Sequence, residues 1–243
     1  MSVFGQLVFS DQGRGRAVPG RLYGLSVLRA EADPLGFWGE RRLRKAGRGL
    51  LRGGARRVLV PRDFRRWPLL RQLGLVPVET EGLVRANCVP LALAALASQG
   101  LSPYRATVAL RGNRAGGEMA RAARELCPRV RCLVVDAPSG GEELARWLRR
   151  EYGVPILPPG ERGHLALRFQ PGGPPREEAA LDLYGPEPDL AGLQLTAPEL
   201  AEGDREDLPL LAALWEGGKL GRREIKITGS LDRRLEKSYN DRT

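Results

Sequence analysis

The stretch ATVALRGNRAGGEMARAARELCPRVRCLVVD, residues 106–136, decides the fold of this chain. Its first six residues are mostly apolar and predict a strand, and the glycines that follow them predict a turn. The segment EMARAAREL has helical spacing, and VRCLVVD predicts a second strand that ends on an acid. A strand, a helix and a strand of these lengths predict a parallel crossover unit.

Segments on both sides repeat this alternation. RRVLVPRD and LVPVET predict strands that flank a short helix, and GGEELARWLRREYG predicts a helix before the strand VPIL. We therefore expect an α/β fold with a mostly parallel, doubly wound sheet. After Pro158, short strands such as HLALRF and REIKIT, with the helix LPLLAALWEGG between them, predict some antiparallel strands near the C-terminus. At the N-terminus, FGQLVF and residues 21–30 are expected to form an antiparallel pair around a turn-like GRGRAVPG.

The pattern leaves one domain or two lobes open, and it does not specify the oligomeric state. As two lobes, the chain would have a basic N-terminal α/β lobe over residues 1–82 and a connecting helix over residues 83–102, with Pro90 in its first turn or at a kink. A C-terminal α/β lobe would follow over residues 103–229. The charged tail, residues 230–243, has no apolar spacing and is expected to fray.

Composition limits the class of protein. A chain of 243 residues with 42% hydrophobic content can bury an ordinary core. Its three cysteines, Cys88, Cys127 and Cys132, have no CxxC spacing, and the first residues do not resemble a secretory leader, so we expect a reduced, cytoplasmic protein. No apolar run approaches the roughly 18 residues of a membrane span.

The net charge of +10 is concentrated at one end. Residues 1–85 hold 17 basic and 7 acidic side chains, whereas the rest of the chain holds 22 of each. GC-rich codons could explain why 35 of the 39 basic residues are arginines, but they do not explain this segregation. Residues 41–71 carry twelve basic side chains and a single acid, Asp63, so we expect an anionic partner for this segment.

Residues 37–51 have apolar residues near helical spacing and predict a basic amphipathic helix. Its candidate anion-binding or nucleic-acid-binding residues are Arg41, Arg42, Arg44, Lys45, Arg48 and Arg52. Clustered arginines bind nucleic acid by releasing counterions, and an acidic protein or an anionic membrane surface are the other partners of this chemistry. A solvated charged face is the structural alternative, in which Trp38 and Trp67 serve as core or interface residues.

The central stretch resembles the start of a Rossmann-type dinucleotide-binding domain over about residues 103–160, as in shikimate-dehydrogenase-like and glutamyl-tRNA-reductase-like enzymes. In that fingerprint, Gly112 and Gly117 fill the first and third glycine positions and Arg114 holds the second. The resemblance implies NAD or NADP as the cofactor and, if the protein is an enzyme, an NAD(P)-dependent oxidoreductase. The implied cofactor site consists of Gly112, Asn113, Arg114, Gly116, Gly117 and Asp136, with Asp136 on the ribose hydroxyls.

Three functions follow from these observations. The first is binding of a nucleotide or another anionic small molecule at the glycine turn, where the Arg114 guanidinium contacts a phosphate. The second is nucleic-acid binding by residues 41–71. The third is a non-catalytic scaffold or regulatory protein, in which the glycines only shape a tight turn and the cleft has no room for a ligand.

The remaining polar residues indicate no catalytic site. His164 stands alone at the start of an apolar strand, which favours a structural role over a metal site or triad. Cys88 at a helix start is the one candidate nucleophile, and buried cysteine is its alternative. Asp63, Asp182 and Tyr184 lie near predicted strand ends, where solvated turn residues have the same pattern. The sequence contains no P-loop, GxSxG or HExxH motif.

Overall fold

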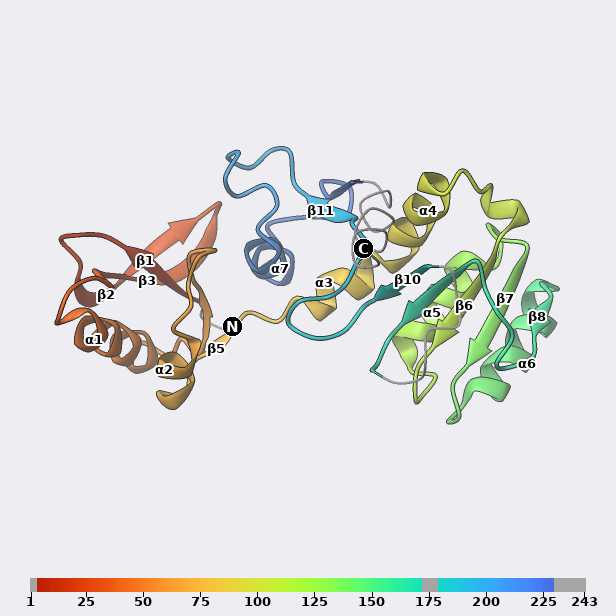
Figure 1. The fold of residues 1–243 in the computed structure, drawn as a ribbon, viewed down its shortest axis with the longest axis horizontal. Helices are drawn as coiled ribbons and strands as arrows, with labels where there is room; N and C mark the ends of the chain where they lie inside the picture. The colour runs from red at the N-terminus through yellow and green to blue at the C-terminus, as the bar shows by residue number, and fades with distance from the viewer. Residues whose placement is uncertain (1–3, 172–178, 230–243) are drawn as a thin grey trace, which may run out of the picture. The chain divides into compact units, whose positions relative to one another are not determined.

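The structure is a computed structural model that describes residues 4–171 and 179–229. The described chain forms two compact units, and neither is continuous in sequence. Unit 1 combines residues 4–79 with residues 197–224, and unit 2 combines residues 80–196 with residues 225–229 (Figure 1). The N-terminal lobe predicted over residues 1–82 is therefore incomplete by itself, because part of the predicted C-terminal lobe belongs to unit 1.

Unit 1 is built on a five-stranded sheet. Its strands are β1 (Phe4–Phe9), β2 (Arg14–Leu22), β3 (Leu25–Ala32), β4 (Arg57–Leu59) and β5 (Val76–Pro77). They lie in the order β2-β3-β1-β4-β5, and each neighbouring pair is parallel except β2 with β3. The carboxyl ends of β1, β3, β4 and β5 therefore meet at one edge of the sheet.

The N-terminal strands correct one expectation. β1 and β3 were expected to pair antiparallel, but they are parallel neighbours. The segment GRGRAVPG, which we interpreted as a turn, lies within the strand β2, which is antiparallel to β3. Glycine and proline also occur in edge strands, so the glycines and the proline of GRGRAVPG do not by themselves indicate a turn. The chain reverses between β2 and β3 at Tyr23 and Gly24, both of which have positive φ.

Three helices of the described chain flank this sheet. They are α1 (Gly39–Arg52), α2 (Trp67–Gln72) and α7 (Leu208–Glu216). Apolar residues of α1 and α2 form a buried core with Leu7 and Ala30 of the sheet. Strand residues alternate between faces, so Leu25 points to the opposite side from Ala30. On that side Leu25 packs closely on Gly217, the residue that follows α7. A Cβ added to Gly217 would lie only 2.3 Å from Leu25 Cδ1.

Unit 2 contains the sheet that the central stretch predicts. Its strands are β6 (Thr107–Arg111), β7 (Cys132–Asp136), β8 (Ile156–Leu157), β9 (Leu165–Arg168) and β10 (Ala179–Asp182). All neighbours are parallel, in the order β10-β9-β6-β7-β8. Numbered along the chain, this is the 3-2-1-4-5 order of a Rossmann-type sheet. The strands β11 (Gln194–Thr196) and β12 (Lys226–Thr228) pair antiparallel, which confirms the expectation for the C-terminal region.

The helices of unit 2 are α3 (Glu81–Ala86), α4 (Cys88–Ser98), the 3-10 turn η1 (Pro103–Arg105), α5 (Gly117–Leu126) and α6 (Gly141–Tyr152). The segment 83–102, expected as one connecting helix, is mostly helical but divided, because α3 and α4 are separate helices that meet at Asn87. The Asn87 side chain donates to Leu83 O (2.9 Å) at this break. Pro90 lies in the first turn of α4, where its missing N–H costs no helical hydrogen bond.

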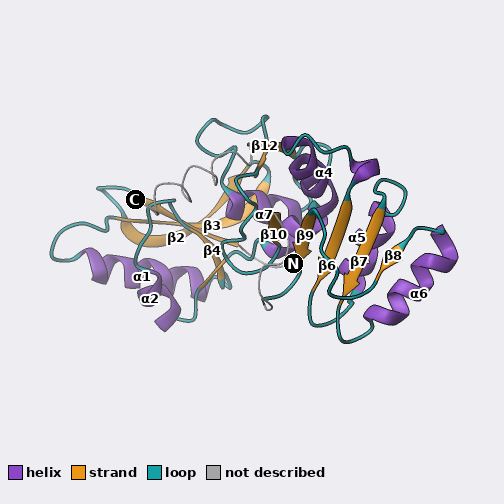
Figure 2. Cartoon of the chain, turned by 45° about the vertical axis from the view of Figure 1, so that its right-hand side comes forward, coloured by secondary structure: helices purple, strands orange, loops and turns teal. Residues whose placement is uncertain are grey.

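A loop, instead of a helix, forms one crossover of unit 2 (Figure 2). Residues 158–164 connect β8 at one edge of the sheet to β9 on the far side of β6. Glu161 O accepts a hydrogen bond from Arg111 Nη2 (2.8 Å), and a Cβ at Gly163 would lie 3.0 Å from Ala109 N. The same face of the sheet carries the fully buried Ala109 and Ala166. Small side chains therefore let the crossing backbone lie close to the strands.

Candidate functional site

The glycine turn of unit 2 lies at the point where the strand order reverses. The chain passes from β6 to β7 and β8 on one side, and then returns to β9 on the other side of β6. In open parallel sheets, ligands bind outside the carboxyl ends of the strands at such a reversal. The turn that starts at Gly112 leaves β6 at this position, which makes it the first candidate site.

The three glycines of the turn have different environments. A Cβ at Gly112 would lie 3.1 Å from Met119 Cε, so Gly112 is the position where strand and helix pack closely. No atom lies within 4 Å of a Cβ built at Gly116 or Gly117. None of the three has a positive φ. The packing role that the fingerprint gives to its third glycine therefore belongs to Gly112 here, and neither packing nor backbone conformation requires glycine at 116 or 117.

Hydrogen bonds hold the turn against two neighbouring loops. The Asn113 N–H donates to Gln170 Oε1 (2.7 Å), and Gln170 follows β9 closely. The Ala115 N–H donates to Ser139 O (2.8 Å), and Arg114 forms a parallel backbone bridge with Ser139. The turn is thus fixed on both sides, and its backbone connection to Ser139 spans the gap between β6 and β7.

The predicted ribose acid, Asp136, is already paired. Its Oδ2 accepts from Arg111 Nη1 in a partly buried ion pair. The Asp136 side chain keeps 30% of its surface exposed, so a second hydrogen bond to a ligand hydroxyl remains sterically open. Arg111 was not among the predicted site residues, although it is the last residue of β6 and directly precedes Gly112.

Helix α5 begins at Gly117 without a side-chain cap. Backbone N–H groups at such an end attract anions, and the exposed Arg114 lies three residues before it. Glu118 in the first turn carries the opposite charge, and it is paired with Arg85 Nη1 (2.9 Å). Arg85 also donates to Leu183 O (3.0 Å) and to Phe169 O (2.9 Å). Sequence patterns gave no signal for Arg85 or Gln170, because their roles depend on loops that meet only in the folded sheet.

The six basic residues predicted on the first helix all belong to α1 in unit 1. Five of them are exposed and share one face of the helix: Arg41, Arg44, Lys45, Arg48 and Arg52. Arg42 is half-buried and pairs with Asp33, and Arg44 pairs with Glu40 (2.6 Å). The predicted amphipathic helix is therefore present, with a basic face and an apolar face that includes Leu43 and Leu50.

Three of the remaining candidates, His164, Asp182 and Tyr184, have structural partners. His164 Nδ1 accepts from the Thr107 N–H (3.0 Å), which joins β9 to β6 at their amino ends. Asp182 accepts from Arg168 Nη1 (3.2 Å) and contacts the Tyr184 hydroxyl (3.4 Å). Asp63 is exposed in a turn, and Cys88 is buried.

All three cysteines are thiols, and burial raises the pKa of Cys127 to about 11. Over residues 4–171 and 179–229, no group of three or more histidine, cysteine or acidic side chains is arranged to hold a metal ion. Within the same residues, each helix is too short or too polar to cross a bilayer.

No family model and no curated protein matches the sequence. Among solved structures, similarity is found to L-tryptophan dehydrogenase from Nostoc punctiforme (13% identity, TM-score 0.30), covering 69% of this chain and 54% of that one. Quinate dehydrogenase from Corynebacterium glutamicum, solved with NAD, is 15% identical with a TM-score of 0.28, covering 70% and 71%. D-lactate dehydrogenase from Escherichia coli is 13% identical with a TM-score of 0.30, covering 70% and 67%. All three of these neighbours are dehydrogenases.

Proposed function

We propose that unit 2 binds an anionic small molecule of the nucleotide or dinucleotide class at the turn formed by residues 112–117. One observation carries the proposal: Gly116 and Gly117 leave open space at the uncapped start of α5, although neither packing nor φ requires glycine there. The turn also lies at the strand-order reversal, and the exposed Arg114 supplies a guanidinium for phosphate.

The site fits a phosphate group better than a whole dinucleotide. The open glycines leave room for phosphate oxygens at the α5 amides. The backbone bridge between Arg114 and Ser139, in contrast, joins the loops that follow β6 and β7, beside the acid that would hold the ribose. If NAD or NADP binds, the carboxylate of Asp136 favours NAD, because it repels a 2′-phosphate. A lysine and aspartate pair of the shikimate-dehydrogenase type has no counterpart in the sequence, so the proposal concerns binding and not hydride transfer.

A Gly117→Asp substitution tests this proposal. The new side chain has space and an acid at a helix start is tolerated, so the variant should fold, but its charge should weaken nucleotide binding at least tenfold. Gly82→Asp is the matched control, because Gly82 also lies in the first turn of a unit 2 helix with no atom near its Cβ. Calorimetric titration with ATP, NADH and NADPH measures both.

The result separates the alternatives. Retained affinity in Gly82→Asp and lost affinity in Gly117→Asp would support the glycine turn as the site. Equal affinity in both variants would remove the turn from the site. If the unsubstituted protein binds none of the three ligands at millimolar concentration, the non-catalytic scaffold replaces the binding function.

A second candidate function is nucleic-acid binding along α1. The observation in its favour is the single exposed face that carries Arg41, Arg48 and Arg52 together with two further basic residues. From position 41 to position 52 this face extends about 16 Å along the helix, at roughly 1.5 Å per residue. That length would allow contacts to several phosphates of one strand.

A further inference from the structure

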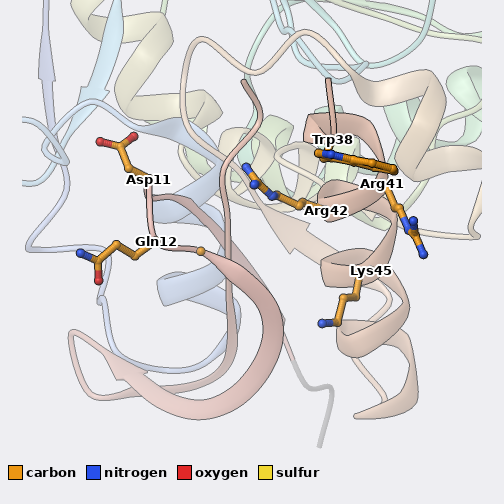
Figure 3. Close-up of a pocket in the computed structure, with 7 residues that line it drawn as sticks. Asp11, Gln12, Trp38, Arg41, Arg42 and Lys45 are labelled. Atoms are coloured by element: carbon orange, nitrogen blue, oxygen red, sulfur yellow. The ribbon is translucent and has the colours of Figure 1, made fainter. Parts of the chain in front are cut away.

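A pocket of about 740 Å³ lies in unit 1, outside the glycine turn. Its lining residues are Asp11, Gln12, Gly13, Trp38, Arg41, Arg42 and Lys45 (Figure 3). The loops that follow β1 and β3 and the first turns of α1 contribute these residues. Because β1 and β3 are parallel, both loops leave the same carboxyl edge of the sheet, which is the edge where α/β sheets bind ligands.

Two glycines allow this close arrangement of loops. A Cβ at Gly13 would lie 2.6 Å from Ala32 N, so the loop after β1 packs directly on the end of β3. A Cβ at Gly39 would lie 2.2 Å from Pro34 O, so the loop after β3 folds back tightly before α1 begins. The walls of the pocket are therefore defined by backbone packing, although Asp11, Gln12 and Trp38 are exposed.

The cationic wall of the pocket comes from α1. Arg42 is held by Asp33, whereas no carboxylate within the described residues pairs with Arg41 or Lys45. Figure 3 shows Arg42 and Lys45 extending from α1 toward the loop that carries Asp11 and Gln12. An anionic group between α1 and this loop would meet two cations from adjacent helical turns, with Arg42 fixed in position.

Trp38 adds an aromatic face at the top of this wall. Its side chain is 51% exposed, and the Arg41 guanidinium lies 5.3 Å from the ring centroid. An exposed indole beside a basic pocket is unusual, since tryptophan is normally well buried. Aromatic side chains in basic grooves stack on nucleobases in single-strand binding proteins.

We propose that this pocket binds a nucleoside monophosphate, with its phosphate between Arg42 and Lys45 and its base on the Trp38 ring. The volume lies within the roughly 300–1,000 Å³ of small-molecule sites and exceeds what a phosphate ion alone would fill. Asp11 and Gln12 line the loop side of the pocket, and Figure 3 shows both side chains extending away from α1, so the ligand contacts come from α1 and Trp38.

The test is calorimetric titration of AMP into the Gly117→Asp protein, in which ligand binding at the glycine turn is weakened. Lys45→Glu should lower AMP affinity at least tenfold. Arg52→Glu is the matched control, since it reverses the same kind of charge on the exposed face of α1 but does not line the pocket, and it should change the affinity less than twofold. Trp38→Leu should weaken AMP binding while leaving inorganic phosphate binding unchanged.

Three outcomes would overturn the proposal. The first is no AMP binding by the Gly117→Asp protein at millimolar concentration. The second is an equal loss in Lys45→Glu and Arg52→Glu together with tighter binding of an eight-nucleotide strand, which would assign the whole face of α1 to nucleic acid. The third is unchanged AMP affinity in Trp38→Leu. Comparison of Lys45→Glu with Arg52→Glu in the same background separates this proposal from nucleotide binding by unit 2, because unit 2 is identical in the two variants.

Discussion

Glycines shape both candidate sites, but for opposite structural reasons. At Gly116 and Gly117 the absence of a side chain leaves open space, whereas at Gly13 and Gly39 it allows backbone segments to touch. The sequence does not distinguish these cases, because the cost of a Cβ depends on atoms that are distant along the chain or beyond the local turn. The fingerprint gives the packing role to its third glycine, whereas Gly112, at the first position, has that role here.

A Gly39→Ala substitution should destabilise unit 1. The new Cβ would clash with Pro34 O, a backbone atom that cannot move alone, and such overpacking costs about 1–3 kcal/mol of unfolding free energy. Gly116→Ala is the control, because its Cβ meets no atom within 4 Å and should change stability by less than about 0.5 kcal/mol. Urea unfolding followed by circular dichroism measures both values, and equal stabilities would contradict the close approach at Gly39.

At the scale of elements, the ends of helices and the crossover loop were the least predictable features. The spacing of apolar residues predicts α5 and α6 correctly, because one buried face per helix leaves a regular pattern. The α7 segment is instead an apolar run, and Leu210 and the four residues after it are all buried. The crossover over residues 158–164 has no such pattern, since it packs by its backbone on small side chains. The break between α3 and α4 also lacks a strong signal, because Asn87 closes it with a local side-chain bond.

Helix α7 provides an element-scale prediction through its cap. Asp207 accepts from the Leu210 N–H (3.1 Å), and burial raises the pKa of the Asp207 carboxyl. Asp207→Ala should lower the unfolding free energy by about 1 kcal/mol because it removes the cap. Asp207→Asn keeps an acceptor without a buried charge, so it should be at least as stable as the original at pH 7.

The pH dependence follows from the direction of this shift. A carboxyl whose folded pKa is raised stabilises the folded state at low pH, and this contribution is lost as the pH rises through the raised value. The original protein should therefore gain stability relative to Asp207→Asn as the pH falls toward 3.8, the ordinary value for aspartate. Urea unfolding between pH 7 and pH 4 measures the difference, and a gap that is constant with pH would contradict a buried, charged cap.

At the scale of the whole molecule, charge is distributed unevenly along the chain. The first 85 residues account for the net charge of +10, and five of their basic side chains lie on one exposed face of α1. Arg42 and Arg44 are paired with acids, so local ion pairs offset part of the basic cluster that the sequence suggests. Both the solvated face and an anionic partner for this face stay predictions.

Salt dependence distinguishes the two uses of this charge. If a single strand binds along α1 and contacts four or five phosphates, the logarithm of its affinity should fall with the logarithm of salt concentration at a slope of about −3. A nucleoside monophosphate held in the pocket should show a much shallower slope. Fluorescence anisotropy with a labelled eight-nucleotide strand from 50 to 300 mM salt measures this, and absence of binding at 50 mM would remove the nucleic-acid candidate.

Short-range patterns of apolar and charged residues predict the α/β class, the parallel unit around residues 106–136 and the basic face of α1. The folded structure is needed to show that residues 197–224 complete unit 1, that β1 and β3 are parallel, and which glycines are packed or open. It also brought Gln170, Ser139 and Arg85 to the glycine turn, and Asp11 and Trp38 to α1. The physical reason is that strand pairing and loop contacts join residues far apart in the chain, and local periodicity carries no information about which partner a strand edge or loop will meet.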